Sequence, residues 1–496
     1  MLKPRQVLVG LLLMAPISLA QETHNHPVPE KLGQVSFPVS CSPSAQQQFN
    51  RGVALLHSFA YAAAAATFQR VAEQDPYCAM AHWGVAMTYF HQLWDPPIVP
   101  QSIPIAQKEI RLAQQIGSGS QREQQFINAL GLIFQNAPAI PYTTRVSNYE
   151  KAMSNLAAQN PKDVEAQVFY ALALLANAPP ADKTHAKQKQ AIAILTPLNR
   201  AFPDHPGIPH YLIHACDNAE LASRGLPAAR AYSKVAPSAP HALHMPSHIF
   251  TQLGLWNDSI ASNLAASAAA HQQGDTGEEL HAMDYLVYAY LQTGRHHDAN
   301  QVIQQLARMP NLDLSDFKVA YAATAIPIRY AIERSQWADA SNIVPPKGAP
   351  PHVIAMAVWS RGLGLARSGQ ITEARAEINR LQQLEADLRT AGNEYWATQV
   401  RILSRELMAW SAQADKKPDE AAALMRASAD EEDTLEKLPV TPGPIVPARE
   451  QLGSLLLEQK RPSLALKEFQ ITLTNAPGRR GALRGAAHAS RLSSRK

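Results

Sequence analysis

Histidine is concentrated in one part of this chain. The 496-residue sequence contains 18 histidines, and eight of them lie between His205 and His281. Imidazole nitrogens bind zinc, iron and copper, and histidine is also a common general acid or base near neutral pH. The sequence therefore predicts a metal or catalytic site in this region.

Two pairs of histidines repeat at the same interval. His210 and His214 are followed 34 residues later by His244 and His248. Within each pair the spacing is i, i+4, which places both rings on one face of a helix. Packed helices lie about 8–10 Å apart, so imidazoles that reach toward each other across that gap can share one ion.

Further histidines and two aspartates extend this set. The carboxylates can be metal ligands, can orient an imidazole, or can serve as a general base, and Asp217 and Asp284 are the candidates for that last role. We predict a transition-metal site, with zinc, iron and copper left open. The ligands are to be drawn from His210, His214, Asp217, His241, His244, His248, His281 and Asp284.

A proline interrupts the helical pattern of this region. Because proline is tolerated in a helix only in the first turn, we expect a helix to begin at Pro246. His241 and His244 would then be ligands on the preceding loop, and His248 would lie in the first turn. Such departures from a regular pattern are expected at functional sites.

The elements that position these residues are predicted to be helices. Ala, Leu, Gln, Glu and Arg dominate the sequence, and alternating β-branched runs are nearly absent. The stretch FNRGVALLHSFAYAAAAATFQRVAEQDPYCAMAHWGVAMTY has the small and aromatic residues of a helical hairpin. These are Gly52, Leu55, Ala64, Phe68 and Val71, with Pro76 ending the unit.

This pattern resembles the tetratricopeptide (TPR) repeat, a helix–turn–helix unit of 34 residues. It recurs at YLVYAYLQTGRHHDANQVIQQL, VWSRGLGLARSGQITEARAEI and LGSLLLEQKRPSLALKEFQITLTNAP. The resemblance covers roughly residues 45–490 and implies an all-α solenoid of stacked hairpins. It also implies that the first helices line a concave groove, where the clustered histidines would converge and a protein or peptide would bind. Single histidines elsewhere, such as His57 and His82, are expected to be packing or hydrogen-bonded residues.

Three functions remain open on this reading, because a TPR-like fold does not define an activity. The first is a binding scaffold whose groove holds a His/Asp site for a transition metal. The second is a metal-dependent enzyme, of hydrolase or oxygenase type, that uses the same site. The third is a protein-interaction module in which the histidines are incidental.

The chain begins with the pattern of a secretory signal peptide. Lys3 and Arg5 precede a short apolar run, and small residues follow up to Ala20. We predict cleavage after Ala20 and a periplasmic or secreted protein. Beyond residues 1–20, the predicted divisions are an extension (21–44), repeats that carry the cluster (45–300), further repeats (301–490) and a frayed basic tail (491–496).

Composition excludes several classes of protein. The chain is 46% hydrophobic and 17% charged, with a net charge of +4, which gives no basic surface for nucleic acid. No second apolar stretch is long enough to suggest a membrane-spanning helix. The sequence selects neither a disulfide among Cys41, Cys78 and Cys216 nor an oligomeric state.

Overall fold

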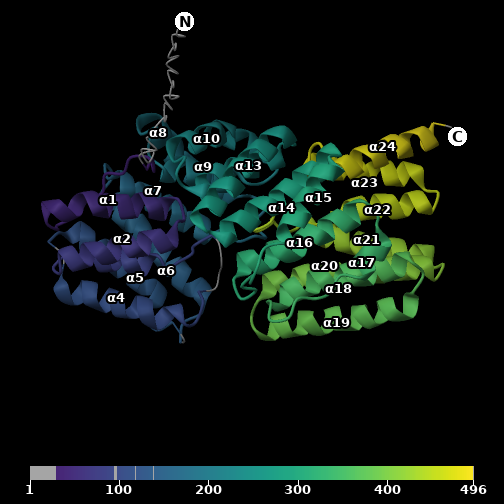
Figure 1. Ribbon diagram of the computed structural model, residues 1–496, viewed down its shortest axis with the longest axis horizontal. Helices are drawn as coiled ribbons and strands as arrows, with labels where there is room; N and C mark the ends of the chain where they lie inside the picture. Colours follow the sequence, from purple (N-terminus) through teal and green to yellow (C-terminus); the bar gives the residue numbers. More distant parts are fainter. Residues whose placement is uncertain (1–29, 94–97, 118, 138, 495–496) are drawn as a thin grey trace, which may run out of the picture. The chain divides into compact units, whose positions relative to one another are not determined.

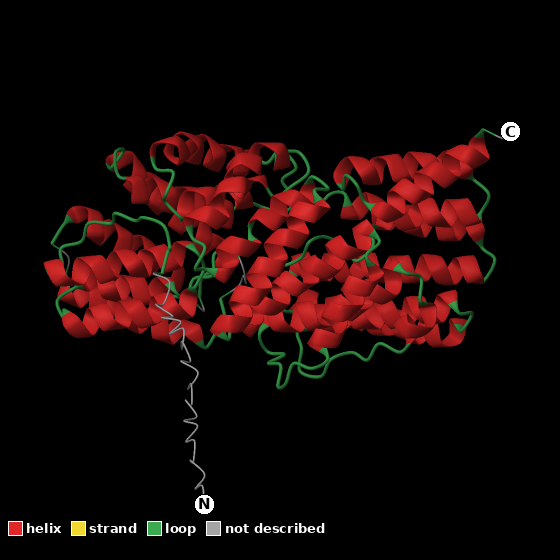
Figure 2. Ribbon diagram, turned by 45° about the horizontal axis from the view of Figure 1, so that its top comes forward, coloured by secondary structure: helices red, strands yellow, loops and turns green. Residues whose placement is uncertain are grey.

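The computed structural model describes residues 30–93, 98–117, 119–137 and 139–494. These residues form helices joined by turns and loops, and no strand occurs among them (Figure 2). The predicted all-α fold is therefore confirmed. The predicted signal peptide, Met1–Ala20, lies outside the described residues.

Short helices follow one another along the chain, and neighbours pack as antiparallel hairpins, such as α1 with α2 and α22 with α23 (Figure 1). The first of them are α1 (Pro43–His57), α2 (Tyr61–Gln74), α3 (Ala79–Met87), α4 (Ser102–Ile116), α5 (Gln121–Phe134), α6 (Tyr142–Gln159), α7 (Val164–Ala176), α8 (Ala186–Ala201), α9 (Gly207–Cys216), α10 (Ala222–Val235), α11 (Pro240–His244) and α12 (Pro246–Gln252). The rest are α13 (Trp256–Gln273), α14 (Thr276–Thr293), α15 (His296–Leu306), α16 (Phe317–Glu333), α17 (Trp337–Ser341), α18 (Pro351–Arg367), α19 (Ile371–Thr390), α20 (Glu394–Ala414), α21 (Pro418–Glu432), α22 (Ala448–Glu458), α23 (Pro462–Asn475) and α24 (Arg480–Ser493).

Glycines let neighbouring helices approach a phenylalanine closely. A Cβ atom built on Gly52 would lie 2.6 Å from the Phe68 ring, and one on Gly84 would lie 2.4 Å from it. Phe68 is fully buried, so its ring fills the space between α1 and α3. The same arrangement recurs near the C-terminus, where Phe469 lies against Gly453 and Gly485. These small–aromatic contacts explain the TPR-like pattern of the sequence.

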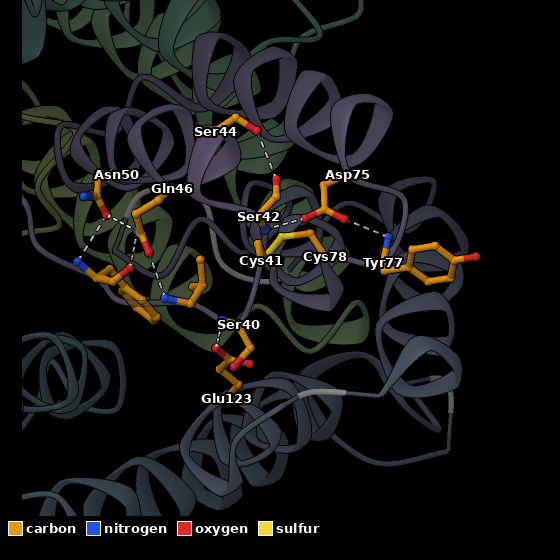
Figure 3. Close-up of a disulfide and its surroundings, with 12 residues drawn as sticks. Ser40, Cys41, Ser42, Ser44, Gln46, Asn50, Asp75, Tyr77, Cys78 and Glu123 are labelled. Carbon is orange, nitrogen blue, oxygen red and sulfur yellow. Dashed lines mark hydrogen bonds between the residues drawn. A yellow bond between two sulfur atoms is a disulfide. The ribbon is translucent and has the colours of Figure 1, made fainter.

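The segment before α1 is tied to the start of α3 by a disulfide between Cys41 and Cys78 (Figure 3). The Cα atoms of the two cysteines lie 4.9 Å apart. Beside it, the Asp75 carboxylate accepts hydrogen bonds from the backbone N–H groups of Ser42 and Tyr77, at 2.6 and 3.2 Å. The third cysteine, Cys216, is buried and has a free thiol.

The predicted divisions of the chain meet the structure at both ends. Part of the predicted extension, 21–44, packs into the core: Phe37 is fully buried, and its ring lies 5.6 Å from that of Trp83. At the other end α24 continues to Ser493, so the tail predicted to be frayed from 491 begins as helix. Lys31–Lys496 form one compact unit, and the boundary at 300–301 stays a prediction. No described helix is both long enough and apolar enough to cross a bilayer.

Candidate metal centre

Four helices bring six histidines together. His210 and His214 lie on α9, His241 and His244 on α11, His248 on α12 and His281 on α14. All six side chains are buried, and the most exposed residue, His214, is only 9% accessible. They therefore do not line an open groove, as the TPR resemblance implied.

The first histidine group consists of His210, His214 and His241. The Nε2 atoms of His214 and His241 lie 3.1 and 3.2 Å from the Nε2 atom of His210. One ligand atom from each residue lies within 4.8 Å of the others, which is compatible with a shared metal ion. The helical pair at i, i+4 and a ring from the next repeat thus meet as the sequence predicted.

The second histidine group consists of His244, His248 and His281, and it repeats this arrangement. The Nε2 atoms of His244 and His248 lie 3.0 Å apart, and the ring of His281 lies 4.2 Å from that of His244 between centroids. These three residues also offer ligand atoms within 4.8 Å of one another.

In the first group the second ring nitrogen fixes where the protons are. His210 Nδ1 faces the backbone carbonyl of His57 at 2.6 Å, and His241 Nδ1 faces the Glu278 carboxylate at 3.0 Å. A carbonyl and a carboxylate only accept hydrogen bonds, so both Nδ1 atoms carry the proton. Although burial raises the pKa of Glu278, Lys318 and His241 outweigh it and hold that pKa well below its usual range. In neutral rings both Nε2 atoms are then lone pairs, 3.2 Å apart.

The second group is locked in the same way. His244 Nδ1 faces Asn263 Oδ1 at 2.6 Å, and the orientation of that amide is set because Asn263 Nδ2 donates to the Ser259 carbonyl at 2.8 Å. His248 Nδ1 faces the Asp217 carboxylate at 2.7 Å. Both rings therefore hold their proton on Nδ1, and two Nε2 lone pairs face each other at 3.0 Å.

Two facing lone pairs repel each other unless a cation lies between them. A proton is disfavoured, because burial, together with neighbouring histidines, lowers the pKa of His210 and His248 well below the usual value. Burial likewise lowers the pKa of His244 to about 3. A metal cation satisfies both lone pairs at once, with imidazole as a preferred ligand of zinc and copper.

The two groups lie next to each other. The ring of His214 lies 5.9 Å from that of His248, and the ring of His241 lies 6.1 Å from that of His244. Within the groups, neighbouring rings are 4.2–6.2 Å apart. The six rings therefore form one continuous cluster.

One aromatic ring covers each group. The Phe59 ring contacts all three rings of the first group, with centroids 4.4–5.7 Å apart. The Tyr285 ring contacts all three of the second group at 4.7–5.3 Å. Phe59 has a φ of 54°, a left-handed conformation that costs about 1–3 kcal/mol in a bulky residue. The fold thus holds Phe59 over the first group against a local preference.

The predicted aspartates have different roles. Asp217 orients His248 and also accepts hydrogen bonds from Lys437 and Gln252, so of its three predicted roles it holds that of orienting an imidazole. Asp284 is fully buried and is bound by the Arg329 guanidinium, with Nε 2.7 Å from Oδ1. It belongs to neither histidine group.

The expected loop before Pro246 is wrong. His241 and His244 lie on the short helix α11, and Met245 has helical torsions, φ −52° and ψ −36°. The chain therefore passes almost without interruption from α11 into α12, because Pro246 occupies the first turn of α12 and needs no N–H there. As a result His244 and His248 share one face at i, i+4.

A third group of ligating residues has a different character. His57 and His205 both donate from Nε2 to the buried Glu165 carboxylate, at 2.9 and 3.0 Å. His205 Nδ1 accepts from the Gly207 N–H, and His57 Nδ1 faces the Tyr211 hydroxyl. Every contact here has a proton to share, so this group needs no metal. It confirms the expected hydrogen-bonded role of His57, while the contact of the His57 carbonyl with His210 was missed.

A distant part of the chain closes over the second group. The segment between α21 and α22, residues 433–447, contributes Lys437, whose ammonium lies 2.5 Å from Asp217. The Tyr285 hydroxyl lies 3.3 Å from His248 Nδ1 and donates to carbonyls of this segment, those of Pro439 and Thr441. No sequence signal linked these residues to the histidines.

Comparison with known proteins gives similarity in fold. No protein-family model matches the chain, and no curated protein matches it. Solved structures similar to it include the TPR domain of P58(IPK), the human IFIT1 dimer with m7Gppp-AAAA and yeast Tom70. The respective identities are 12%, 11% and 10%, and the TM-scores are 0.23, 0.37 and 0.32. The alignments cover 91%, 84% and 90% of this chain and 99%, 91% and 88% of those chains.

The helical hairpins and their small–aromatic contacts define the class of the protein. It is a TPR-like α-solenoid, as the sequence predicted. Its distinguishing feature is a buried cluster of six histidines.

Proposed function

We propose that this protein is an exported, TPR-like scaffold that binds transition-metal ions, one in each histidine group. The observation that carries the proposal is the pair of facing Nε2 lone pairs, His210 with His241 and His244 with His248, at 3.2 and 3.0 Å. In each pair the other nitrogen is held as a donor by an acceptor that cannot give a proton back. A buried cation is the partner that this chemistry requires.

The donor set selects among metals. Three imidazoles with no carboxylate in contact with the ion suit zinc or copper. Magnesium, calcium and manganese prefer oxygen ligands, and non-haem iron sites typically combine two histidines with a carboxylate. Zinc and copper are therefore the proposed ions, in preference to iron.

Export is the second part of the proposal. The leader ending at Ala20 has the pattern of a cleaved signal peptide. The disulfide between Cys41 and Cys78 supports an oxidising compartment, because structural disulfides are rare in the cytosol. Both observations favour a periplasmic or secreted protein.

Metal analysis tests the proposal directly. The full chain, expressed with its own leader and purified without a histidine tag, should contain about two metal ions by mass spectrometry. The His244→Ala/His248→Ala variant should lose the ion of the second group. His271→Ala is a matched control, because the His271 side chain is 74% exposed and lies outside both groups, so it should keep both ions.

The opposite result would be decisive. Wild-type protein without metal, even after incubation with zinc and with copper, would overturn the proposal. The protein-interaction module would then be the remaining hypothesis, and the histidine cluster would be a packing feature.

A further inference from the structure

We infer that the two histidine groups hold a pair of copper ions that together bind one molecule of dioxygen; this inference rests on the function proposed above. It depends on three features of the described residues. These are the contact between the groups, the charges around them and the small size of the accessible space.

The contact between the groups makes the two ions a pair. Rings of different groups are 5.9 and 6.1 Å apart, within the range found inside a single group. His241 and His244 lie three residues apart on α11 and serve different groups, so this helix joins the two ions. Paired metal sites in enzymes hold their ions about 3.5–4 Å apart, which allows one small molecule to contact both.

The charges around the cluster favour monovalent ions. The two carboxylates that orient the rings are already neutralised: Asp217 by Lys437 at 2.5 Å, and Glu278 by Lys318 at 3.0 Å. These four side chains therefore supply no net negative charge to the ions. Burying an ion costs more as its charge rises, so Cu(I), with one charge, is favoured over zinc with two.

The coordination is open, but only to a small ligand. Three protein nitrogens leave a position free at an ion that takes four ligands. The six histidines are at most 9% exposed, and Phe59 and Tyr285 cover them, which excludes a large organic molecule from direct contact. A cavity of about 170 Å³ is lined by Gln252 and Lys437, the side chains that bond Asp217, and provides an approach for small molecules.

The electron balance of the step is complete without another reactant. Each Cu(I) gives up one electron, and dioxygen accepts both and becomes a peroxide dianion that bridges two Cu(II) ions. Bonds form from oxygen to copper, the O–O double bond becomes a single bond, and no proton is taken up. The pair carries two positive charges before the step, and pair and peroxide together carry two afterwards. The buried charge is unchanged, which suits a site whose neighbouring carboxylates are already neutralised.

The test loads the full chain with Cu(I) under anaerobic conditions and then admits air. We expect two copper ions per chain, uptake of one dioxygen per two copper ions, and no electron paramagnetic resonance signal from the product, because the bridged Cu(II) spins couple. Zinc-loaded protein is the control for folding, since it fills both groups but takes up no dioxygen.

The outcomes separate the inference from the proposed function. Absence of bound copper and zinc overturns both. Two bound copper ions that oxidise to isolated Cu(II), with a full paramagnetic signal, overturn the inference and leave metal binding intact. The His244→Ala/His248→Ala variant, checked for unchanged helicity, should bind one copper ion and lose more than 90% of the dioxygen uptake, whereas His271→Ala should retain it.

Discussion

His244 and His248 lie on one helical face with their Nε2 atoms 3.0 Å apart, and neither ring has a proton there to give the other. Asn263 holds the proton of one ring on Nδ1, and Asp217 holds that of the other. The protein thus maintains a repulsive contact in its interior with two dedicated acceptors. Such a contact is stable when a cation is present, and this dependence leads to measurable consequences.

Metal removal should lower thermal stability. Ions that bind only the folded chain stabilise it by about 4 kcal/mol at a free concentration 1,000 times Kd. A strong chelator should therefore lower the Tm by several degrees in differential scanning fluorimetry. The Tm of the His244→Ala/His248→Ala variant should respond less, and an unchanged wild-type Tm would contradict metal binding.

Asp217→Asn should weaken metal binding without unfolding the chain. The carboxylate orients His248, and loss of such a partner typically costs 10–100-fold in metal affinity. Competition with a chromophoric chelator measures this change. Glu109→Gln is the matched control, because Glu109 holds His82 at 2.7 Å outside both groups, and it should leave the affinity unaltered.

Phe59→Ala should speed the loss of metal from the first group. The ring covers His210, His214 and His241, so its removal admits water and chelator while all ligand nitrogens remain. Stopped-flow transfer of metal to a chelator should become at least tenfold faster for one of the two ions. Phe202→Ala, at a residue that is 44% exposed, should transfer metal at the wild-type rate. Equal rates for both variants would mean that Phe59 does not protect the group.

Loss of the disulfide should cost stability but no metal. Cys41 and Cys78 are separated by 37 residues, and closing a loop of that length contributes about 4 kcal/mol by the chain-entropy estimate. The Cys41→Ser/Cys78→Ser variant should unfold at lower urea concentration, as should the wild type under reducing conditions. Its metal content should equal that of the wild type, since neither cysteine lies in a histidine group. A loss of metal would show that the disulfide also positions the cluster.

Glu432 should make stability fall as the pH rises. Burial raises its pKa to about 7 from 4.5, and Glu406, with a pKa also raised by burial and by Glu432, lies nearby. The folded chain then binds more protons than the unfolded chain between about pH 4.5 and 7, so this contribution to stability is present below 4.5 and is lost as the pH rises through 7. The slope is at most about 1.4 kcal/mol per pH unit for one group.

Glu432→Gln provides the comparison for that pH dependence. The amide oxygen can still accept the hydrogen bond from the Ala448 N–H, but the side chain no longer titrates. Urea unfolding from pH 5 to 8 should therefore show a smaller decline for the variant than for the wild type. Parallel curves would rule out Glu432 as the source.

The sequence predicted the histidine pairs because a helix repeats its faces at regular intervals. The 34-residue echo of His210 and His214 at His244 and His248 is enough to bring the rings together once neighbouring hairpins pack. Their i, i+4 spacing survived even Pro246, which needed only a first turn. The all-α, TPR-like architecture follows from equally local signals, such as Gly52 and Phe68.

The partners of the rings could not be predicted in this way. The acceptors for His210 and His244 are a backbone carbonyl at residue 57 and an amide on α13, which have no sequence motif. Asp284 has the residue type and spacing of a ligand, but Arg329 on α16 takes up its charge. Tertiary contacts of this kind depend on how helices far apart in sequence are packed.

The segment between α21 and α22 supplies none of the six nitrogens, yet it bonds to Tyr285 and Asp217 beside them. The ligands are complete at residue 281, more than 150 residues before Lys437 is synthesised. A chain that folds from its N-terminus can therefore capture its ions while the cluster is still open, and it then seals them in when the C-terminal helices dock. The last third of the molecule governs how fast ions exchange, whereas the first two thirds determine how tightly they are held.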